Sequence, residues 1–100
     1  MKELLFVYGT LKSPTIQKAV FKRTAPKDPD ILKGYKKSKF KIRNFFCPVI
    51  VSDPNGYVLG LLIEVTKEEL ILIDKYETGA YKRKKVTLKS GKESWVYVKS

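Results

Sequence analysis

The sequence predicts an α+β protein in which a small mixed β-barrel is flanked by short helices. The chain has 100 residues, of which 43% are hydrophobic, so it is long enough for one core of ordinary size. Its β-like and helix-like segments follow the order β-α-(β)-β-β-α-β-β. Many strands in a short chain favour a small barrel with helices packed outside it. We therefore expect one domain over residues 1–100.

The chain begins with a strand and a short helix. Glu3–Tyr8 is apolar on both faces, as in a strand that lies inside a sheet. Gly9 follows it and allows a sharp turn. Ser13 and Pro14 then supply an N-cap and a first-turn proline. Apolar residues at helical spacing predict a helix over Thr15–Arg23.

The middle of the chain contains a basic ribbon and a second β segment. Ala25–Asp30 holds two prolines and is predicted to be a loop. Lys33–Arg43 alternates imperfectly between apolar and basic residues, which predicts a strand or irregular ribbon with one wet face. Phe45–Val51 is apolar and β-like, and Pro48 within it indicates a bulge or an edge. Asp53–Gly56 (Asp-Pro-Asn-Gly) predicts a turn.

A strong strand and a well-capped helix follow. Tyr57–Val65 is apolar on both faces except at Glu64. Thr66 and Glu69 form the pattern of a capping box, which opens a helix. We expect this helix to run to about Tyr76 and to end at the next residues, Thr78 and Gly79. Its inner stripe consists of Leu70 and Ile73.

The C-terminal segment predicts a hairpin. Tyr81–Leu88 and Glu93–Lys99 are β-like, and Ser90 and Gly91 between them are turn residues. Trp95 and Tyr97 lie on one face of the last strand, and we expect them in the core.

The composition excludes several kinds of chemistry. The sequence contains no histidine, which removes Ser-His-Asp and Cys-His catalysis and imidazole metal ligands. Its one cysteine, Cys47, excludes an intrachain disulfide and a Cys-rich zinc site. We interpret Cys47 as a small buried hydrophobe. Acid–base chemistry must then come from ten carboxylates, from Lys or Tyr, or from this thiol.

The net charge of +11 is concentrated in the first half of the chain, where residues 1–50 carry +9. The Lys33–Arg43 segment, with Tyr35 and Phe40, and the Lys82–Lys85 run could contact phosphates. We favour a solvated cationic face, because 18 of the 21 basic residues are Lys and nucleic-acid readers rely more on Arg. We therefore do not expect nucleic acid as a partner.

The apolar runs are much shorter than the roughly 20 residues that a membrane span requires. The N-terminus lacks the pattern of a secretory signal. The sequence thus predicts a cytoplasmic protein without a membrane partner, and it leaves the oligomeric state open.

The first candidate site is the turn after the first strand, formed by Tyr8, Gly9, Thr10 and Leu11. A glycine directly after a buried strand lets the backbone approach a ligand closely. Consecutive N–H groups at such a turn can bind a carboxylate or a developing oxyanion. An ordinary strand-to-loop turn is the alternative.

The second candidate is Glu77, near the end of the second helix. It follows Leu70 by seven residues and Ile73 by four, so a helix that reaches it projects it on the apolar side. Burial and the negative end of the helix dipole would both raise its pKa, which suits a group that takes and returns a proton near neutrality. Alternatively, the helix ends at Tyr76 and Glu77 faces solvent or pairs with Arg83.

At these two motifs the chain resembles the γ-glutamylcyclotransferase-like family, which includes the γ-glutamylamine cyclotransferases and a plant avirulence-induced group. The first strand of that family ends in Tyr-Gly-Ser/Thr-Leu, matched here by Tyr8–Leu11. A Gly-x-Leu strand is matched by Gly60–Leu62. After a short helix, Asp-x-Tyr-Glu and Tyr-x-Arg are matched by Asp74–Glu77 and Tyr81–Arg83. The segments agree in order and spacing over nearly the whole chain.

The resemblance implies a small mixed β-barrel and a reaction that needs no metal or cofactor. The α-amine of a γ-glutamyl amine or γ-glutamyl amino acid attacks its own side-chain carbonyl, which releases 5-oxoproline and an amine or amino acid. The resemblance assigns the acid/base role to Glu77. It implies that the Tyr8–Leu11 turn holds the substrate and polarises the carbonyl, and that Tyr81 helps to shape the pocket.

Two other functions remain open from the sequence. The same fold can serve as a non-catalytic domain that binds a small carboxylate or amine. Less favoured is a basic nucleic-acid-binding protein, suggested by the net charge.

Overall fold

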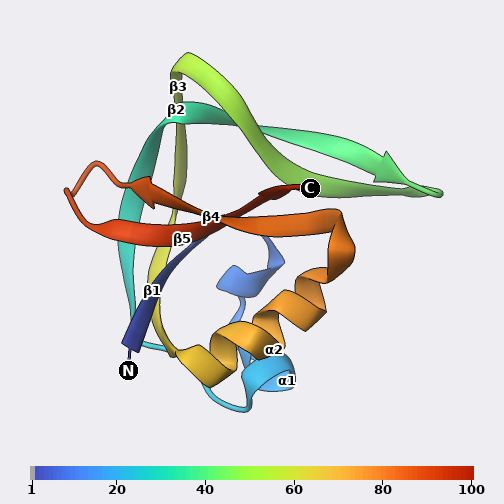
Figure 1. Cartoon of the computed structure of the whole chain (residues 1–100), viewed down its shortest axis with the longest axis vertical. Coiled ribbons are helices and arrows are strands. Elements are labelled where there is room, and N and C mark those ends of the chain that lie inside the picture. The colour runs from blue at the N-terminus through green and yellow to red at the C-terminus, as the bar shows by residue number, and fades with distance from the viewer. Residues whose placement is uncertain (1) are drawn as a thin grey trace.

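The computed structural model of the chain describes residues 2–100 and shows a single curled sheet with two helices (Figure 1). Neither helix among these residues is long and apolar enough to cross a membrane. The elements are β1 (Lys2–Val7), the 3-10 turn η1 (Thr10–Lys12), α1 (Pro14–Phe21), β2 (Lys27–Ile42), β3 (Phe45–Thr66), α2 (Lys67–Glu77), the 3-10 turn η2 (Thr78–Ala80), β4 (Tyr81–Thr87) and β5 (Glu93–Lys99).

The five strands are arranged in the order β2-β3-β1-β5-β4. Only the β1–β5 pair is parallel, and the three other pairs are antiparallel. The sheet curls into a half-barrel, so that its two edge strands approach one another. There the backbone N–H of Lys89, just after β4, donates to the carbonyl of Ile31 in β2 at 2.8 Å. The predicted α+β class with a small barrel-like sheet is confirmed.

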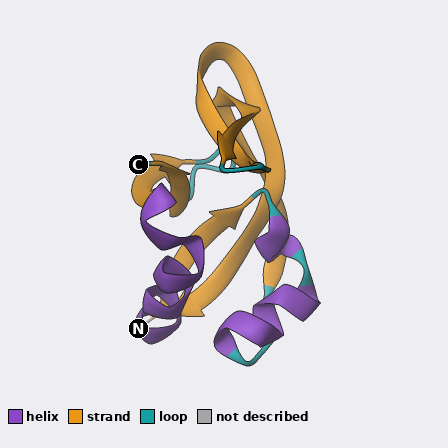
Figure 2. Ribbon diagram, turned by 90° about the vertical axis from the view of Figure 1, so that its right-hand side faces the viewer, coloured by secondary structure: helices purple, strands orange, loops and turns teal. Residues whose placement is uncertain are grey.

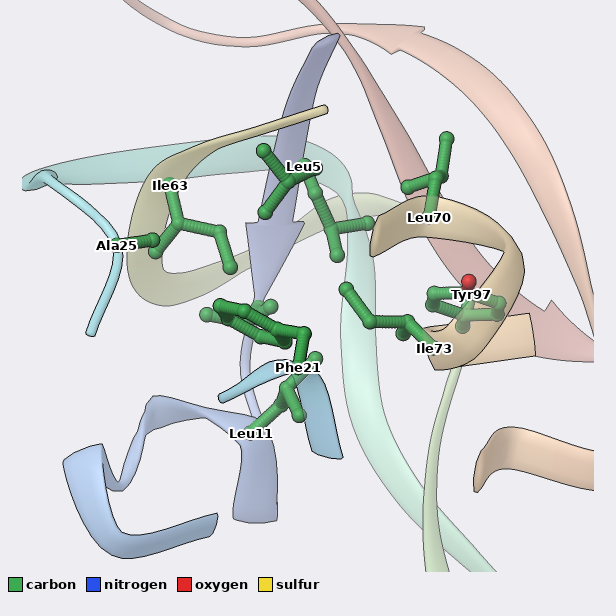
Figure 3. Close-up of a cluster of buried hydrophobic side chains, with 10 residues drawn as sticks. Leu5, Leu11, Phe21, Ala25, Ile63, Leu70, Ile73 and Tyr97 are labelled. Carbon is green, nitrogen blue, oxygen red and sulfur yellow. The ribbon is translucent and has the colours of Figure 1, made fainter. Parts of the chain in front are cut away.

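β1 is buried on both faces because it lies at the centre of the sheet, as the sequence predicts. Leu5 and Val7 face a core shared with the two helices, where they pack with Leu70 and Ile73 (Figure 3). Phe6 and its neighbours on the other face fill the inside of the curl. The end of β1 is therefore packed on both faces at the point where the following loop begins.

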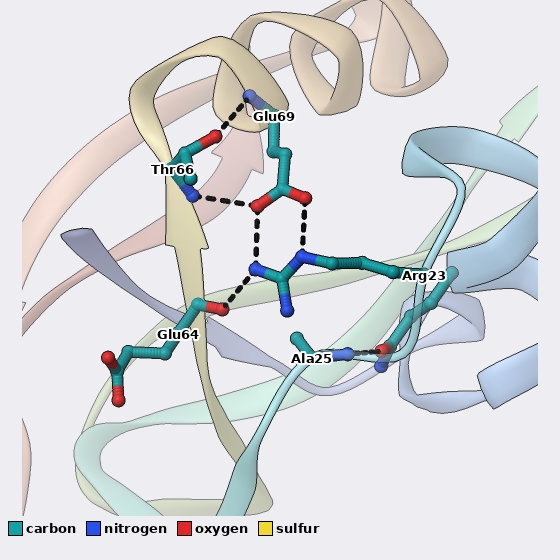
Figure 4. Close-up of polar contacts among 6 residues, drawn as sticks. Arg23, Ala25, Glu64, Thr66 and Glu69 are labelled. Atoms are coloured by element: carbon teal, nitrogen blue, oxygen red, sulfur yellow. Dashed lines mark hydrogen bonds and ion pairs between the residues drawn. The ribbon is translucent and has the colours of Figure 1, made fainter. Parts of the chain in front are cut away.

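The two helices lie at the end of the molecule opposite the bend of β2 and β3 (Figure 2). Both begin at the predicted caps. The hydroxyl of Ser13 accepts from the N–H of Ile16, and a complete capping box opens α2. Arg23 joins them by two hydrogen bonds to the carboxylate of Glu69, at 2.6 and 2.7 Å (Figure 4).

Two sequence-based predictions are wrong in β2 and β3. Lys27–Asp30, expected to be part of a loop, starts β2, because an edge strand tolerates proline on its unpaired side. Asp53–Gly56, expected to be a turn, lies within the continuous strand β3. Its four residues oppose Gly34 alone, so the turn chemistry produces a large bulge in the strand and not a reversal of the chain. The chain reverses instead after Ile42, where Arg43 has a φ of 56°.

Candidate functional site

A cavity of about 370 Å³ lies where the end of β1, the last turn of α2, the start of β4 and the β2–β3 hairpin meet. All six site residues that the sequence singled out line it: Tyr8, Gly9, Thr10, Leu11, Glu77 and Tyr81. The fold thus brings residues as far apart in the chain as Tyr8 and Tyr81 to one cavity.

The Tyr8–Leu11 turn is stabilised by hydrogen bonds of the buried side chain of Gln17. Leu11 is 3% exposed, and its carbonyl accepts from the side-chain amide of Gln17 at 2.9 Å. The amide oxygen of Gln17 accepts from the N–H of Ala25 at 2.9 Å. The backbone N–H groups of Thr10 and Leu11 open a 3-10 turn and therefore have no partner within it. These two donors suit a carboxylate or an oxyanion.

The side chain of Tyr8 lines the cavity, and its hydroxyl already forms a hydrogen bond within the protein. Its O–H donates to the carbonyl of Tyr97 at 2.7 Å. Burial raises the pKa of the Tyr8 phenol well above its ordinary value, and the nearby phenol of Tyr81 adds to this. The side chain therefore stays neutral and ties the end of β1 to β5.

Gly9 leaves space that a larger residue would occupy. Its φ is −120°, a value that other residues adopt. A Cβ built on Gly9 would lie 3.4 Å from Cγ of Pro48, which lines the same cavity. An added methyl group would thus narrow the cavity beside Pro48 at an ordinary contact distance.

Glu77 is the last residue of α2 and is half-buried at the cavity. Burial raises its pKa to about 7, with a smaller contribution from the charge of Asp74 one turn earlier. Of the alternatives that the sequence left open, the helix end at Tyr76 and the pairing with Arg83 do not occur. The Arg83 Nε donates to Asp74 Oδ1 at 2.8 Å instead. Within residues 2–100 the Glu77 carboxylate has no hydrogen-bond partner and no ion pair.

The backbone directly after Glu77 is strained. Thr78 has a φ of 62° and a ψ of −173°, a region that is essentially reserved for glycine. The helix thus ends one residue later than expected, and abruptly. At this residue the chain changes direction between α2 and β4, and Glu77 and the start of β4 line the same cavity.

Tyr81 closes the cavity on the side of the β2–β3 hairpin. Its hydroxyl donates to the carbonyl of Pro48 at 2.5 Å, and its ring meets Phe40 edge-on. Burial raises the Tyr81 pKa to about 12, and the neighbouring Cys47 and Glu77 add to this. Tyr81 therefore joins β4 to the hairpin as a neutral group.

The sequence reasoning missed part of the cavity wall. Cys47, interpreted as a small buried hydrophobe, is half-buried and lines the cavity beside Pro48. Ile42 and Phe46 at the hairpin tip also line it, although they are exposed by 37% and 64%. Gln17 carried no signal beyond its place in a helix. Strand register decides these placements, and a single sequence does not reveal it.

The described residues contain no group of three or more His, Cys, Asp or Glu side chains that could hold a metal ion. Glu77 is the only residue with a formally charged side chain among those that line the cavity. The arrangement thus offers one proton acceptor, two open backbone donors and an otherwise neutral wall.

Known proteins resemble the chain in sequence and in fold. A sequence model of the family "Gamma-glutamyl cyclotransferase, AIG2-like" matches residues 5–100. "AIG2-like protein C" of Arabidopsis thaliana is 32% identical over 83 residues, which are 82% of this chain and 47% of that protein. The chain spans about half the length of the curated relatives that it matches.

Solved structures share the fold. A protein of Arabidopsis thaliana solved in solution superposes with a TM-score of 0.84 at 26% identity, covering 98% of this chain and 68% of that one. A structure named "Gamma-glutamyl cyclotransferase" superposes with a TM-score of 0.78 at 19% identity, covering 100% of this chain and 68% of that one. At the latter identity the likeness concerns the fold alone.

Proposed function

The chain belongs to the γ-glutamyl cyclotransferase, AIG2-like family, and we propose that it converts a γ-glutamyl amine or γ-glutamyl amino acid into 5-oxoproline. The observation that carries the proposal is Glu77, an unpaired carboxylate with a pKa of about 7 that lines a cavity beside the open N–H groups of the Tyr8–Leu11 turn. A base with a pKa near the working pH is the group that this proton transfer requires.

In the proposed reaction Glu77 first takes a proton from the substrate α-ammonium group. The free amine attacks the γ-carbonyl carbon, and the carbonyl electron pair moves onto oxygen to form a tetrahedral oxyanion. When the oxyanion collapses, the bond from the γ-carbon to the leaving nitrogen breaks. Glu77 returns its proton to that nitrogen as the bond breaks. The ionised Glu77 then takes the second proton from the ring nitrogen and passes it to the released amine, which leaves as an ammonium ion while the ring remains as 5-oxoproline. No water is consumed.

The Tyr8–Leu11 turn would bind the substrate at the other side of the cavity. The N–H groups of Thr10 and Leu11 suit either the α-carboxylate or the oxyanion, because preorganised backbone donors stabilise charge without rearrangement. Tyr8 and Tyr81 keep their protons in bonds to backbone carbonyls. They would shape the cavity and exclude water, leaving the proton transfers to Glu77.

The test is 5-oxoproline release from a panel of γ-glutamyl amines, γ-glutamyl amino acids and glutathione. We expect turnover of at least one class, and a loss of about 10²-fold or more in Glu77→Gln with the fold retained. Glu68→Gln, an exposed glutamate at the other end of the same helix, is the control and should keep full activity. Unchanged turnover in Glu77→Gln would exclude Glu77 as the acid/base.

A non-catalytic domain that binds a small ligand in the same cavity is the second candidate. The neutral apolar wall and the open backbone donors favour binding of a small carboxylate irrespective of catalysis. An inactive wild type whose melting temperature rises with γ-glutamyl compounds would support this function in place of the enzyme.

A further inference from the structure

Asp74 lies one helical turn before Glu77 and accepts two hydrogen bonds at the same oxygen. The hydroxyl of Tyr97 donates to Asp74 Oδ1 at 2.6 Å, and Nε of Arg83 donates to it at 2.8 Å. Arg83 and Tyr97 are cross-strand partners in β4 and β5. The side chains of two neighbouring residues of the sheet thus donate hydrogen bonds to one carboxylate of α2.

The Arg83 guanidinium is also held from its other side. Its Cζ lies 4.6 Å from the centroid of the Trp95 ring, and the indole N–H of Trp95 donates to Glu3 at 2.9 Å. Stacking on an aromatic ring fixes the plane of a guanidinium as well as its position. The Trp95 ring on one side and the Asp74 carboxylate on the other therefore hold the Arg83 side chain in place.

Asp74 and Glu77 lie three residues apart in α2, and Arg83 pairs with Asp74. Residues i and i+3 are neighbours on a helix surface, so a guanidinium beside Asp74 has Glu77 as the next carboxylate within reach. The other titratable groups around Glu77 are the phenols of Tyr8, Tyr81 and Tyr97, the Tyr76 phenol on its own helix, and the Cys47 thiol. Among these neighbours, Asp74 is the group whose charge raises the pKa of Glu77, after the larger effect of burial, and Arg83 is the cation that pairs with Asp74.

We infer that Asp74 is a positioning residue that engages Arg83 and so keeps the Glu77 carboxylate without a cationic partner at the cavity. This inference rests on the proposed function of Glu77 as acid/base. Were Arg83 to pair with Glu77, the ionised carboxylate would be stabilised and its pKa would fall by about 1–3 units. Glu77 would then no longer hold a proton for the leaving nitrogen near neutrality.

The experiment follows the titration of Glu77 directly, by ¹³C NMR of glutamate side-chain carboxyl groups between pH 4 and 9. The resonance is assigned by its loss in Glu77→Gln. Asp74→Asn is nearly isosteric and keeps an acceptor for Tyr97, and its fold is checked by thermal melting. We expect this variant to lower the titration midpoint of Glu77 by about 1–3 units.

Two double variants with equal net charge separate the movement of Arg83 from the mere loss of the Asp74 charge. Asp74→Asn with Arg83→Gln should return the midpoint at least halfway to the wild-type value. Asp74→Asn with Lys82→Gln, which removes an exposed neighbouring cation, should not. Equal midpoints in the Asp74→Asn variant and the Asp74→Asn/Arg83→Gln variant would overturn the inference.

Arg83→Gln alone provides a second test that does not depend on the folding of Asp74→Asn. It should leave the Glu77 midpoint at or above the wild-type value, because Asp74 then lacks its cation, and a lowered midpoint would overturn the inference. The pH profile of 5-oxoproline release should follow the same order of variants. A wild type without turnover would overturn the proposed function, while the NMR titration would still decide the role of Asp74.

Discussion

Glu77 combines two properties that rarely occur together in a surface carboxylate: partial burial and the absence of a partner. Ionisation at such a position is disfavoured in the folded state, and its pKa of about 7 expresses this. In the unfolded chain the group returns to its ordinary value of 4.5. The proposed catalytic residue is therefore also a source of instability near neutral pH.

Glu77→Gln should consequently stabilise the protein at pH 8. Because the folded-state pKa lies above the unfolded value, the wild type loses stability as the pH rises from about 4.5 to about 7, and the variant does not. After allowance for solvent screening at a half-exposed group, we expect a gain of about 1 kcal/mol. Urea unfolding at pH 8 and pH 4 measures it. A gain of equal size at both pH values would contradict the titration of Glu77 as its cause.

Gly9→Ala tests the width of the cavity. The nearest atom to the added methyl group is 3.4 Å away, so packing opposes the substitution little and the free energy of unfolding should change by less than about 1 kcal/mol. Substrate turnover or ligand binding should fall, since the methyl group enters the space beside Pro48.

Gly60→Ala is the contrasting variant for Gly9→Ala. At Gly60 an added Cβ would lie 2.5 Å from the carbonyl oxygen of Val7 and 2.6 Å from the ring of Phe6, so this substitution should destabilise the fold strongly. Thermal melts and activity of the two variants show which glycine serves the cavity. A Gly9→Ala protein with full activity would show that this space is not used.

At the scale of elements, the two ends of α2 are built differently. Its start is stabilised by the capping box and by the Arg23 ion pair, which lowers the pKa of Glu69. Its end carries the strained Thr78 and the unpaired Glu77. Stability is thus concentrated at the end remote from the cavity, and strain at the end that forms it, a distribution that is common at functional sites.

Thr78→Gly should relieve the strain at the end of α2. Glycine adopts a φ of 62° and a ψ of −173° freely, and the relief outweighs its greater unfolded-state entropy by about 1 kcal/mol. The melting temperature is the measurement. Thr78→Ala keeps the backbone strain and also removes the hydroxyl that accepts from the N–H of Ala80, so it should show no gain. A stabilised alanine variant would assign the effect to the side chain.

At the scale of the whole molecule, the lysines have a structural explanation in the sheet. β2 is an edge strand of 16 residues, and lysines along such an edge discourage pairing with other chains. Several lysines also lie over aromatic rings, among them Lys39 over Phe46 at 4.9 Å. The net charge of +11 nevertheless acts on a molecule with a radius of gyration of only 12.9 Å.

The melting temperature should therefore rise between 10 mM and 300 mM NaCl. At about 10 mM the screening length of roughly 30 Å is more than twice the radius of gyration of 12.9 Å, so positive charges repel one another over most of the fold. Potassium chloride should have the same effect, which separates screening from specific ion binding. A melting temperature that falls with salt would show that local ion pairs such as Lys2–Glu64 outweigh the overall repulsion.

Local signals explain which parts of the fold could be predicted. A cap, a turn residue or an apolar run acts within a few residues of the chain. The start of both helices, the central position of β1 and the C-terminal hairpin could therefore be predicted from the sequence by itself. The sequence also placed Glu77 on the apolar side of α2, since helical periodicity follows from the chain alone.

Tertiary structure decided the rest, because it depends on which strands pair and in what register. Asp53–Gly56 became a bulge and not a reversal because the neighbouring strand continues past it with one residue, Gly34. Cys47 reached the cavity through the register of the β2–β3 hairpin. Above all, the cross-strand pair of Arg83 and Tyr97 selected Asp74 over Glu77 as the partner of the cation, and no spacing along the chain distinguishes these two carboxylates.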